Sequence, residues 1–439
     1  MKERASRAMP ISKLARAGVA GRLAVTSALR SLNPRKPSPE EEWKARGEAF
    51  FAACARLKGL PLKLAQMLSQ EEELLPEEFR QELSKSCYQS PPMNRALVRR
   101  AVIGNLGAEP ENLFREFSET PFAAASLGQV HRAVTMDGRT LALKLQYPGI
   151  ARTVRNDLAV VAGFASALPW LKEVESAWTE VAARMLEELS YLEEARWTIW
   201  FRERLGIPGV TVPEVFPNFS SDTVLATELM SGAHLNEWLA GSPSQADRDA
   251  LAALLWKIYL RSVYELGALN ADPNPGNFLI RSNAGKAAPT IAMLDFGCVK
   301  EVPAGFADNL RKMFAFHSQG KPGPGVSLVD EYVRLGMMRV TERGRDFSDL
   351  EARMRSMGEW VVRPYQGEPA SGSRAFDFGA AGDYFRRCRT EAWDLFRSVK
   401  GIQFAPDFVF LDRARYGLYR TFQKLGARVD MGNALEGMP

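Results

Sequence analysis

Two short stretches of the chain decide the fold: NADPNPGN at residues 270–277 and MLDFG at residues 293–297. The first is too rich in proline to form a helix, so Asp272 and Asn277 can point into one cleft. The second follows an apolar run and supplies another carboxylate, Asp295. Phosphoryl transfer requires groups that hold Mg²⁺ on the phosphates and a group that orients the attacking oxygen. We therefore expect Asp272 to be catalytic, and Asn277 and Asp295 to be metal ligands.

The chain upstream carries a lysine where such a site requires one. Residues 128–134 and 140–147 are two β-prone runs around the Asp-Gly dipeptide at 137–138, which is a strong hairpin signal. Lys144 lies in the second run, where strand alternation places it on the same face as Ala142. A single lysine of this kind is usually an edge charge. Its order in the chain before the two stretches above predicts that Lys144 is catalytic and holds the nucleotide phosphates.

A run of small residues precedes this hairpin: Ala123, Ala124, Ala125 and Ser126. Small side chains let backbone N–H groups approach a phosphate closely, as glycines do in ordinary nucleotide-binding loops. Because alanine is less free than glycine at positive φ, this loop should be stiffer. The same residues also fit a helix N-terminus or a tight turn. Their place before Lys144 favours nucleotide binding.

A second nucleotide contact is expected where the small lobe ends. Residues 223–229 are β-prone and lead through Ser231 and Gly232 into a helical region. Backbone groups at such a connection can form hydrogen bonds with an adenine ring. We therefore expect Glu228 and Met230 to contact the nucleotide.

The lysine also needs an acidic partner that fixes its position. A helical stretch over residues 174–203 lies between Lys144 and the later strands, and it carries four candidates. A glutamate on a helix surface is usually only solvated, so topology alone does not choose among them. The candidates are Glu187, Glu188, Glu193 and Glu194.

The order of the predicted elements is typical of an α+β, two-lobed arrangement. Together with the motifs above, it resembles an atypical protein-kinase-like fold with an N-terminal helical extension. Residues 40–115 are expected to form the extension, residues 116–230 the N-lobe and residues 231–439 the helical C-lobe. Within the N-lobe, residues 210–215 are predicted as a strand that precedes the strand at 223–229. Residues 367–382 are rich in glycine and are predicted as an exposed loop.

The composition excludes several classes of protein. The chain has 439 residues, of which 46% are hydrophobic and 25% charged, and this is ordinary globular composition. No run reaches the ~18 uncharged apolar residues of a membrane-spanning helix. Four scattered cysteines fit neither a disulfide framework nor a zinc site. The cysteines read as free thiols in a reducing compartment, so we expect a cytoplasmic protein. The net charge of +5 does not by itself indicate nucleic-acid binding, and we expect no nucleic-acid partner.

Residues 1–39 form a basic N-terminal segment. No acidic residue stands between Glu3 and Glu40, and apolar residues are interleaved with the basic ones. A basic amphipathic helix of this kind can lie on an anionic membrane surface. Two alternatives remain at this point, namely a solvated, partly disordered terminus and a helix packed on the main body.

Taken together, these motifs resemble those of the UbiB/ADCK (AarF-type) family of atypical protein-kinase-like proteins, from about residue 40 to the end. The alanine run resembles the alanine-rich loop that replaces a glycine-rich loop in that family. Residues 141–149 resemble its lysine strand and following turn, and residues 271–278 resemble its catalytic loop. The resemblance also implies that Glu194, within YLEEA at residues 191–195, is the glutamate that pairs with Lys144.

Two motifs of the family are altered here. KLAQ at residues 63–66 resembles the KxGQ motif with alanine in place of glycine, and ELS at residues 188–190 resembles the ExD motif with serine in place of aspartate. Asn270 stands where the family often has histidine. In the family both motifs lie over the nucleotide cleft. The resemblance therefore implies gating of the cleft by Lys63, Gln66 and Glu188.

The resemblance implies an Mg-ATP-dependent ATPase, or a small-molecule or lipid kinase, in isoprenoid-quinone (ubiquinone) biosynthesis. ATP or ADP and Mg²⁺ would be its ligands, and isoprenoid lipid or quinone-biosynthesis proteins its partners, with peripheral contact at the inner face of a membrane. Transfer to protein is not expected, because the chain passes from Gly297 through Val302 and Pro303 straight into a helical pattern without a peptide platform. The alternatives are a non-hydrolysing nucleotide-binding scaffold and an antibiotic- or choline-type phosphotransferase.

Overall fold

The computed structural model divides the chain into two compact units. Unit 1 comprises residues 1–97 and 146–189, and unit 2 comprises residues 98–145 and 190–439. Most of the basic segment lies outside the described residues, as do Lys63, Gln66 and Ser126. The described residues are 38–57, 65, 68–69, 75–85, 93–125, 127–156, 158, 182–183, 185–272, 274–283, 287–318, 327–342, 344–367, 373–398 and 401–432.

Two packed helices form the described part of the predicted extension within unit 1. Helices α2 (Pro39–Leu57) and α4 (Glu77–Leu83) pack through Phe79, whose ring lies 5.9 Å from Trp43 and 6.0 Å from Phe50. Gly47 permits the close approach, because a Cβ there would lie 2.9 Å from the carbonyl oxygen of Phe79.

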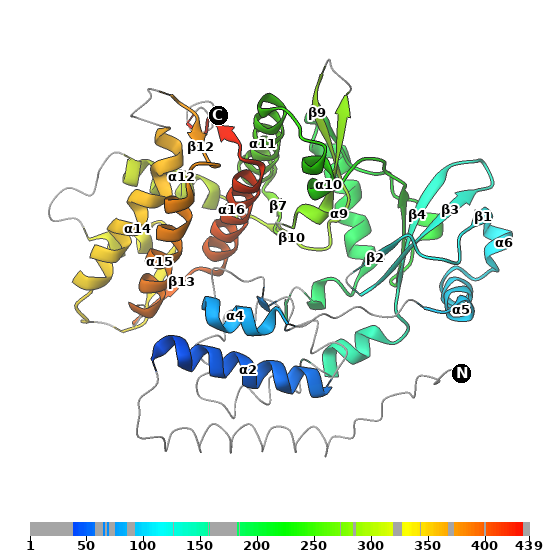
Figure 1. The fold of residues 1–439 in the computed structure, drawn as a ribbon, viewed down its shortest axis with the longest axis horizontal. Coiled ribbons are helices and arrows are strands. Elements are labelled where there is room, and N and C mark those ends of the chain that lie inside the picture. Colours follow the sequence, from blue (N-terminus) through cyan, green and yellow to red (C-terminus); the bar gives the residue numbers. More distant parts are fainter. Residues whose placement is uncertain are drawn as a thin grey trace. The chain divides into compact units, whose positions relative to one another are not determined.

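A small antiparallel sheet opens unit 2, after helices α5 (Arg95–Leu106) and α6 (Pro110–Leu113). The strand order is β1-β3-β4-β6, with β2 paired to β3 (Figure 1). Gly138, at φ +89°, turns the hairpin between β3 and β4, as the Asp-Gly signal predicts. The strands are β1 (Phe114–Phe117), β2 (Ala123–Ala125), β3 (Gly128–Thr135), β4 (Thr140–Gln146) and β6 (Val224–Glu228).

Strand β4 shows the alternation that the sequence predicts. Leu141, Leu143 and Leu145 are fully buried, whereas Ala142 and Lys144 point to the opposite face of the sheet. Three buried leucines fix the register of the strand, because a shift by one residue would expose all of them. The packing of β4 therefore determines where the Lys144 side chain points.

The larger part of unit 2 is mainly helical, with short strands near its junction with the small sheet. A three-stranded sheet has the order β5-β9-β8, and β7 pairs with β10. None of the described helices is both long enough and apolar enough to span a bilayer. The elements are α9 (Tyr191–Arg204), β5 (Val210–Thr211), α10 (Leu235–Ala240), α11 (Gln245–Leu260), β7 (Ala268–Asn270), β8 (Phe278–Asn283), β9 (Ala287–Met293), β10 (Val299–Glu301), α12 (Phe306–Ser318), α13 (Leu328–Arg334), β11 (Met338–Val340), α14 (Ser348–Gln366), β12 (Phe376–Asp377), α15 (Gly382–Ser398), β13 (Ile402–Phe404), α16 (Pro406–Leu425) and β14 (Arg428–Val429).

The segment predicted as one strand at 210–215 is divided between two sheets. Strand β5 pairs in parallel with β9, so Val210 and Thr211 belong to the three-stranded sheet. Val215 instead forms a bridge with Thr227 of β6. The prediction of a single strand is wrong, because Pro213 lacks the N–H that a continuous ladder needs.

The region predicted as an exposed loop at 367–382 contains a buried strand. Strand β12 pairs with β14, and Phe376 and Phe378 are fully buried. Phe378 packs against Tyr419 and Phe422 of α16, with ring centroids 5.2 Å apart in both pairs. The glycines around these phenylalanines suggested a solvent-exposed turn, but two large apolar side chains gain more from burial than a loop does from exposure.

Candidate active site around Lys144 and Asp295

The centre of the site is a lysine between two carboxylates. The Nζ atom of Lys144 lies 3.0 Å from both carboxylate oxygens of Glu194 and 3.0 Å from Oδ2 of Asp295. It also lies 5.0 Å from the centre of the Tyr191 ring, which is close enough for a cation–π contact. Glu194 is almost fully buried, whereas the Asp295 side chain is 37% exposed. The structure thus brings together residues that are far apart in the sequence.

Mutual attraction keeps all these charges in place. Burial would lower the pKa of Lys144, but the carboxylates of Asp295 and Glu194 outweigh it and hold the pKa well above its usual value. Burial by itself would raise the pKa of the Asp295 carboxyl group. The charge of Lys144 and the hydrogen bond from the Gly297 amide outweigh burial and hold this pKa below its usual value. At neutral pH the lysine is therefore a cation and Asp295 an anion.

Helix α9 positions Glu194 through its buried stripe. Tyr191, Ala195, Thr198 and Phe201 are buried at helical spacings, and Glu194 lies within the same stripe. Glu193 points outward and pairs with Arg196. The structure thereby selects Glu194 from the glutamates that topology left open, and the apolar stripe is the signal in the sequence that could have selected it.

The loop after β9 is fitted closely to α9. The ring of Phe296, which is fully buried, lies 5.0 Å from that of Phe201. The amide of Gly297 donates a hydrogen bond of 2.8 Å to Oδ1 of Asp295. A Cβ at Gly297 would lie 3.2 Å from that oxygen and 3.7 Å from Oε2 of Glu194. A side chain at this position would therefore crowd the Asp295 carboxylate, which glycine leaves free of such a contact.

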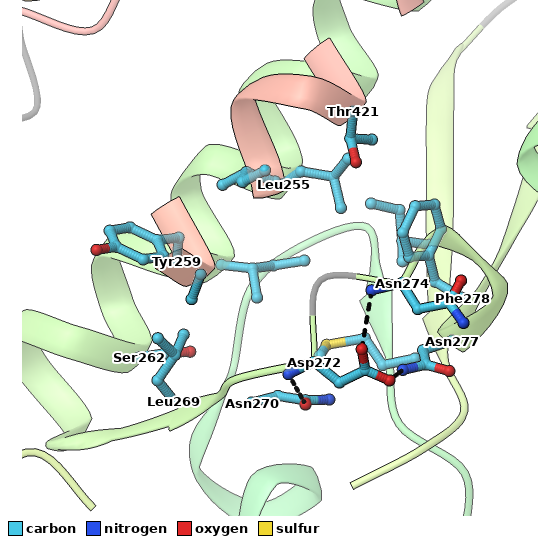
Figure 2. Close-up of a pocket in the computed structure, with 15 residues that line it drawn as sticks. Leu255, Tyr259, Ser262, Leu269, Asn270, Asp272, Asn274, Asn277, Phe278 and Thr421 are labelled. Carbon is cyan, nitrogen blue, oxygen red and sulfur yellow. Dashed lines mark hydrogen bonds between the residues drawn. The ribbon is translucent and has the colours of Figure 1, made fainter. Parts of the chain in front are cut away.

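The catalytic loop holds Asp272 and Asn277 together. Nδ2 of Asn277 donates a hydrogen bond of 2.6 Å to Oδ2 of Asp272, and the backbone N–H of Asn274 donates one of 3.2 Å to Oδ1 of Asp272 (Figure 2). The amide of Leu294 donates to the carbonyl oxygen of Asn277, which ties this loop to the segment before Asp295. The carboxylate of Asp272 and the side-chain amide of Asn277 thus lie side by side.

Asn270 joins the two halves of the site, and the sequence did not reveal this role. Its Nδ2 atom donates a hydrogen bond of 2.7 Å to the carbonyl oxygen of Asp295, and its Oδ1 atom accepts one of 3.2 Å from the Asp272 amide. One side chain therefore fixes the backbone next to both acidic residues. An asparagine can do this because its amide carries a donor and an acceptor on one rigid group.

The predicted nucleotide contacts lie on the small sheet and at its end. Ala123, Ala124 and Ala125 form β2 and pair with β3, so this stretch is one strand of a hairpin rather than a helix N-terminus. Glu228 ends β6 and is exposed. Met230 is buried with Leu279 and Ala292.

The altered motif at residues 188–190 lies where the chain passes from unit 1 to unit 2. Glu188 is half-buried at the end of unit 1, whereas Ser190 belongs to unit 2. Ser190 is the N-cap of α9, and its hydroxyl accepts a hydrogen bond of 3.4 Å from the Glu193 amide. The serine that replaces the family's aspartate therefore begins the helix that carries Glu194.

Comparison with known proteins gives a consistent result. The profile of the ABC1 atypical kinase-like domain matches residues 86–319. AarF domain-containing protein kinase 1 of Mus musculus is 31% identical over 252 residues, which cover 56% of this chain and 48% of the relative. Atypical kinase coq-8, mitochondrial, of Caenorhabditis elegans is 32% identical over 281 residues, which cover 63% of this chain and 36% of the relative. The chain thus spans about half or less of the length of these relatives.

A solved structure resembles the chain over almost its whole length. It is the complex of Rv3197 from Mycobacterium tuberculosis with erythromycin, with a TM-score of 0.61 and 25% sequence identity, and the alignment covers 94% of this chain and 97% of that one. The profile match alone covers more than half of the chain. The fold, the motifs and these matches agree with the UbiB/ADCK resemblance, and the chain belongs to the ABC1 atypical kinase-like family.

Proposed function

We propose that this chain is an Mg-ATP-dependent ATPase or small-molecule kinase of the UbiB type. The observation that carries the proposal is the position of the Lys144 ammonium, 3.0 Å from both oxygens of Glu194 and 3.0 Å from Asp295. A lysine fixed by a buried glutamate beside an exposed carboxylate can steady the phosphates of a nucleotide. Lys144 and Glu194 thus act as one phosphate-holding pair.

The oxygen-bearing side chains near Lys144 fit Mg²⁺. This ion prefers hard oxygen ligands and is usually held by few protein groups, because it keeps several of its waters. The carboxylate of Asp295 and the amide oxygen of Asn277 are such ligands, and the absence of a side chain at Gly297 leaves space beside Asp295. When bound, the ion neutralises charge that develops on the phosphates.

Asp272 would orient the hydroxyl or water that attacks the terminal phosphorus. Its carboxylate is held by Asn277 and Asn274, so it is ready to accept a hydrogen bond from the attacking group. The backbone of Glu228 and Met230 would contact the adenine, and the hairpin of Ala123–Ala125 would cover the phosphates. Helix α12 begins at Phe306 directly after β10, which leaves little room for a peptide platform and favours an acceptor other than protein.

The setting that we propose is isoprenoid-quinone biosynthesis or lipid handling at the inner face of a membrane. One relative is named as an atypical kinase coq-8, and the basic residues of 1–39 fit an anionic surface. Lys63, Gln66 and Glu188 would gate the cleft. Comparing ATP turnover with and without anionic liposomes tests this setting directly.

Phosphate release by purified protein tests the enzymatic assignment. We expect turnover of Mg-ATP by the unaltered chain and at least a ~100-fold loss in Asp295→Ala, because a metal ligand is removed from the transition state. The matched control is Asp308→Ala, which removes an exposed aspartate of α12 that forms an ion pair with Arg311.

The outcomes separate the candidate functions. Normal turnover by Asp295→Ala would overturn the assignment. If the unaltered chain is stabilised by Mg-ATP in a thermal-shift assay but releases no phosphate, the scaffold is supported instead. Stabilisation by a bound ligand depends on its concentration and its affinity for the folded state, so this readout does not require turnover.

A further inference from the structure

A pocket lies beside the catalytic loop, and its empty space together with the open solvent at its mouth is about 700 Å³. Helices α11 and α16 form one side of it, and the loop that carries Asp272 and Asn277 forms the other (Figure 2). The proposed roles of Lys144, Glu194 and Asp295 do not use this space, because none of the three lines it.

The walls of the pocket away from the catalytic loop are mainly apolar, although Ser262 and Thr421 also line them. Side chains from both helices and from β9 contribute to them: Leu255 and Ile258 of α11, Ala414 and Leu418 of α16, and Ile291 and Met293 of β9. Such a surface gains free energy when hydrocarbon displaces water from it. The body of a matching ligand is therefore hydrocarbon.

The polar end of the pocket is the proposed catalytic group. Asp272, Asn274 and Asn277 all line it, and Asp272 is the carboxylate that both asparagines hold. A carboxylate accepts hydrogen bonds and does not donate them when ionised. The complementary group at this end of a ligand is a hydroxyl, which can replace the amide of Asn277 as a donor to Asp272.

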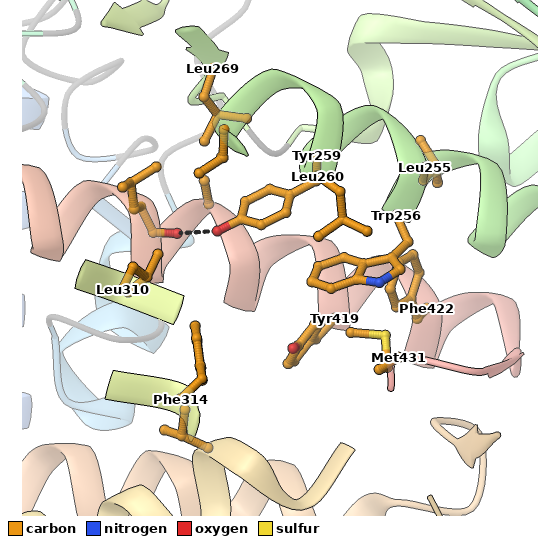
Figure 3. Close-up of a cluster of buried hydrophobic side chains, with 14 of the residues drawn as sticks. Leu255, Trp256, Tyr259, Leu260, Leu269, Leu310, Phe314, Tyr419, Phe422 and Met431 are labelled. Carbon is orange, nitrogen blue, oxygen red and sulfur yellow. Dashed lines mark hydrogen bonds between the residues drawn. The ribbon is translucent and has the colours of Figure 1, made fainter. Parts of the chain in front are cut away.

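The helical wall is firm and locally widened. Trp256 and Tyr259 of α11 stack at 5.1 Å, and the Tyr259 hydroxyl donates a hydrogen bond to the carbonyl oxygen of Leu411 of α16 (Figure 3). After Leu260 the helix continues as a π-helical turn over Arg261–Leu266, which places the buried Ser262 at the pocket. Turns of this kind occur often at functional sites.

We propose that this pocket binds the phosphoryl acceptor, an amphiphilic alcohol with its aliphatic body between α11 and α16 and its hydroxyl at Asp272. The inference rests on the proposed function and names its substrate class. The hydroxyl oxygen forms a bond to the terminal phosphorus of ATP, the bond from that phosphorus to the bridging oxygen breaks, and ADP leaves with the electron pair. The hydroxyl proton passes to Asp272, so that an alkyl phosphate and ADP are the products.

A series of primary alcohols from 1-hexanol to 1-dodecanol tests the proposal, with calorimetry on the full chain and mass spectrometry of the products. We expect affinity to rise about fourfold per methylene until the pocket is filled, and then to level off. The methyl ether of 1-octanol should bind at least about tenfold more weakly than 1-octanol, because it cannot donate to Asp272. With Mg-ATP, octyl phosphate should form in step with ADP.

Variants of the pocket wall locate the bound alcohol. Ala414→Leu fills the pocket and should shift the levelling-off to a shorter alcohol, whereas Leu418→Ala enlarges it and should shift the levelling-off to a longer one. The control is Ala253→Leu, on the exposed face of α11, which should leave the series unchanged. Because the two wall variants shift in opposite directions, a folding defect in one of them does not remove the test.

Three outcomes would overturn the inference: affinity that rises through the whole series without levelling off, equal binding of the methyl ether, or bound alcohol without octyl phosphate while ATP is consumed. Failure of the proposed function is distinct, since the chain would then neither bind nor consume Mg-ATP when no alcohol is present.

Discussion

Lys144 and His317 are both largely buried in unit 2, but the surroundings of Lys144 favour its charged form and those of His317 favour its neutral form. Lys144 lies between two carboxylates and keeps its proton. His317 packs against the backbone at Gly358 of α14 and forms a hydrogen bond of 2.9 Å with the Tyr332 hydroxyl. Burial, and then the positive charge of Arg355, lowers the pKa of His317 to about 4.

The difference shows how burial of an ionisable group is to be interpreted. A buried group with opposite charges around it stays charged and can act on a charged ligand, whereas a buried group without them becomes neutral and serves packing. The lysine group is therefore expected to respond strongly to the removal of one partner. The histidine is expected to respond mainly to acid.

Removal of Lys144 should have the largest effect. Lys144→Met leaves the buried Glu194 carboxylate next to Asp295 without a cation, and we expect a loss of about 3–5 kcal/mol in the free energy of unfolding at pH 7. Glu194→Gln alone should also destabilise the chain. In the double variant the nearly fully buried Glu194 no longer carries a charge without a cation, and only the more exposed Asp295 loses its partner. The loss should therefore be smaller than the sum of the single losses by about 1–3 kcal/mol.

Urea unfolding at pH 7 measures this cycle. The matched control is the exposed pair of Arg196 and Glu193 on the same helix, for which the coupling should be below about 1 kcal/mol. Additive losses for Lys144 and Glu194 would contradict the interpretation that the two charges stabilise each other.

The second-largest effect is expected from acid, which should lower the stability of the chain through His317. The folded chain holds His317 neutral down to a pKa of about 4, whereas an unfolded histidine binds its proton near the ordinary value of 6.5. The unfolded state therefore binds more protons between these values, and stability falls as the pH is lowered through them. We expect this group to remove about 3 kcal/mol between pH 6.5 and pH 4.

The substitution His317→Gln isolates that contribution, because glutamine can keep a hydrogen bond to Tyr332 but does not titrate. The unfolding free energy of this variant should fall less between pH 7 and pH 4.5 than that of the unaltered chain. His234→Gln, at an exposed helix start, is the control. Parallel curves for the His317 variant and the unaltered chain would show that this histidine is not held neutral by the fold.

Local patterns in the sequence predicted those parts of the structure that local chemistry determines. The Asp-Gly turn and the alternation along β4 predicted the face on which Lys144 lies, and both are confirmed. The proline-rich loop brings Asp272 and Asn277 together as expected. The roles of these residues in phosphoryl transfer stay predictions.

Long-range contacts determine the rest. The link that Asn270 forms between Asp272 and Asp295 depends on two loops meeting, and no spacing in the sequence indicates it. The burial of Phe376 and Phe378 likewise depends on α16, which follows later in the chain. Pattern-based prediction describes one segment at a time, so it misses an interaction that arises only when segments meet.

The smallest effect is expected for the serine caps of the two helices that position the partners of Lys144 and His317. Ser190 caps α9, which carries Glu194, and Ser327 caps α13, which carries Tyr332, the partner of His317. Replacing either serine by alanine should remove about 1 kcal/mol of stability, because a backbone N–H near the helix start loses its acceptor. Ser190→Asp keeps an acceptor and should lose little stability.

The variants at the two caps should differ in their affinity for Mg-ATP. Ser190→Ala loosens the first turn of α9 and hence the position of Glu194, so it should weaken Mg-ATP binding severalfold. Ser327→Ala also removes the hydrogen bond that its hydroxyl donates to Glu351, so it should lose at least as much stability, yet leave the affinity for Mg-ATP unchanged. Ser190→Asp should keep that affinity close to the value of the unaltered chain. The affinity of all three variants for Mg-ATP is measured from the thermal shift as a function of the Mg-ATP concentration. If both alanine variants lower the affinity alike, the effect arises from general loss of stability, and the cap at Ser190 has no particular part in positioning the glutamate.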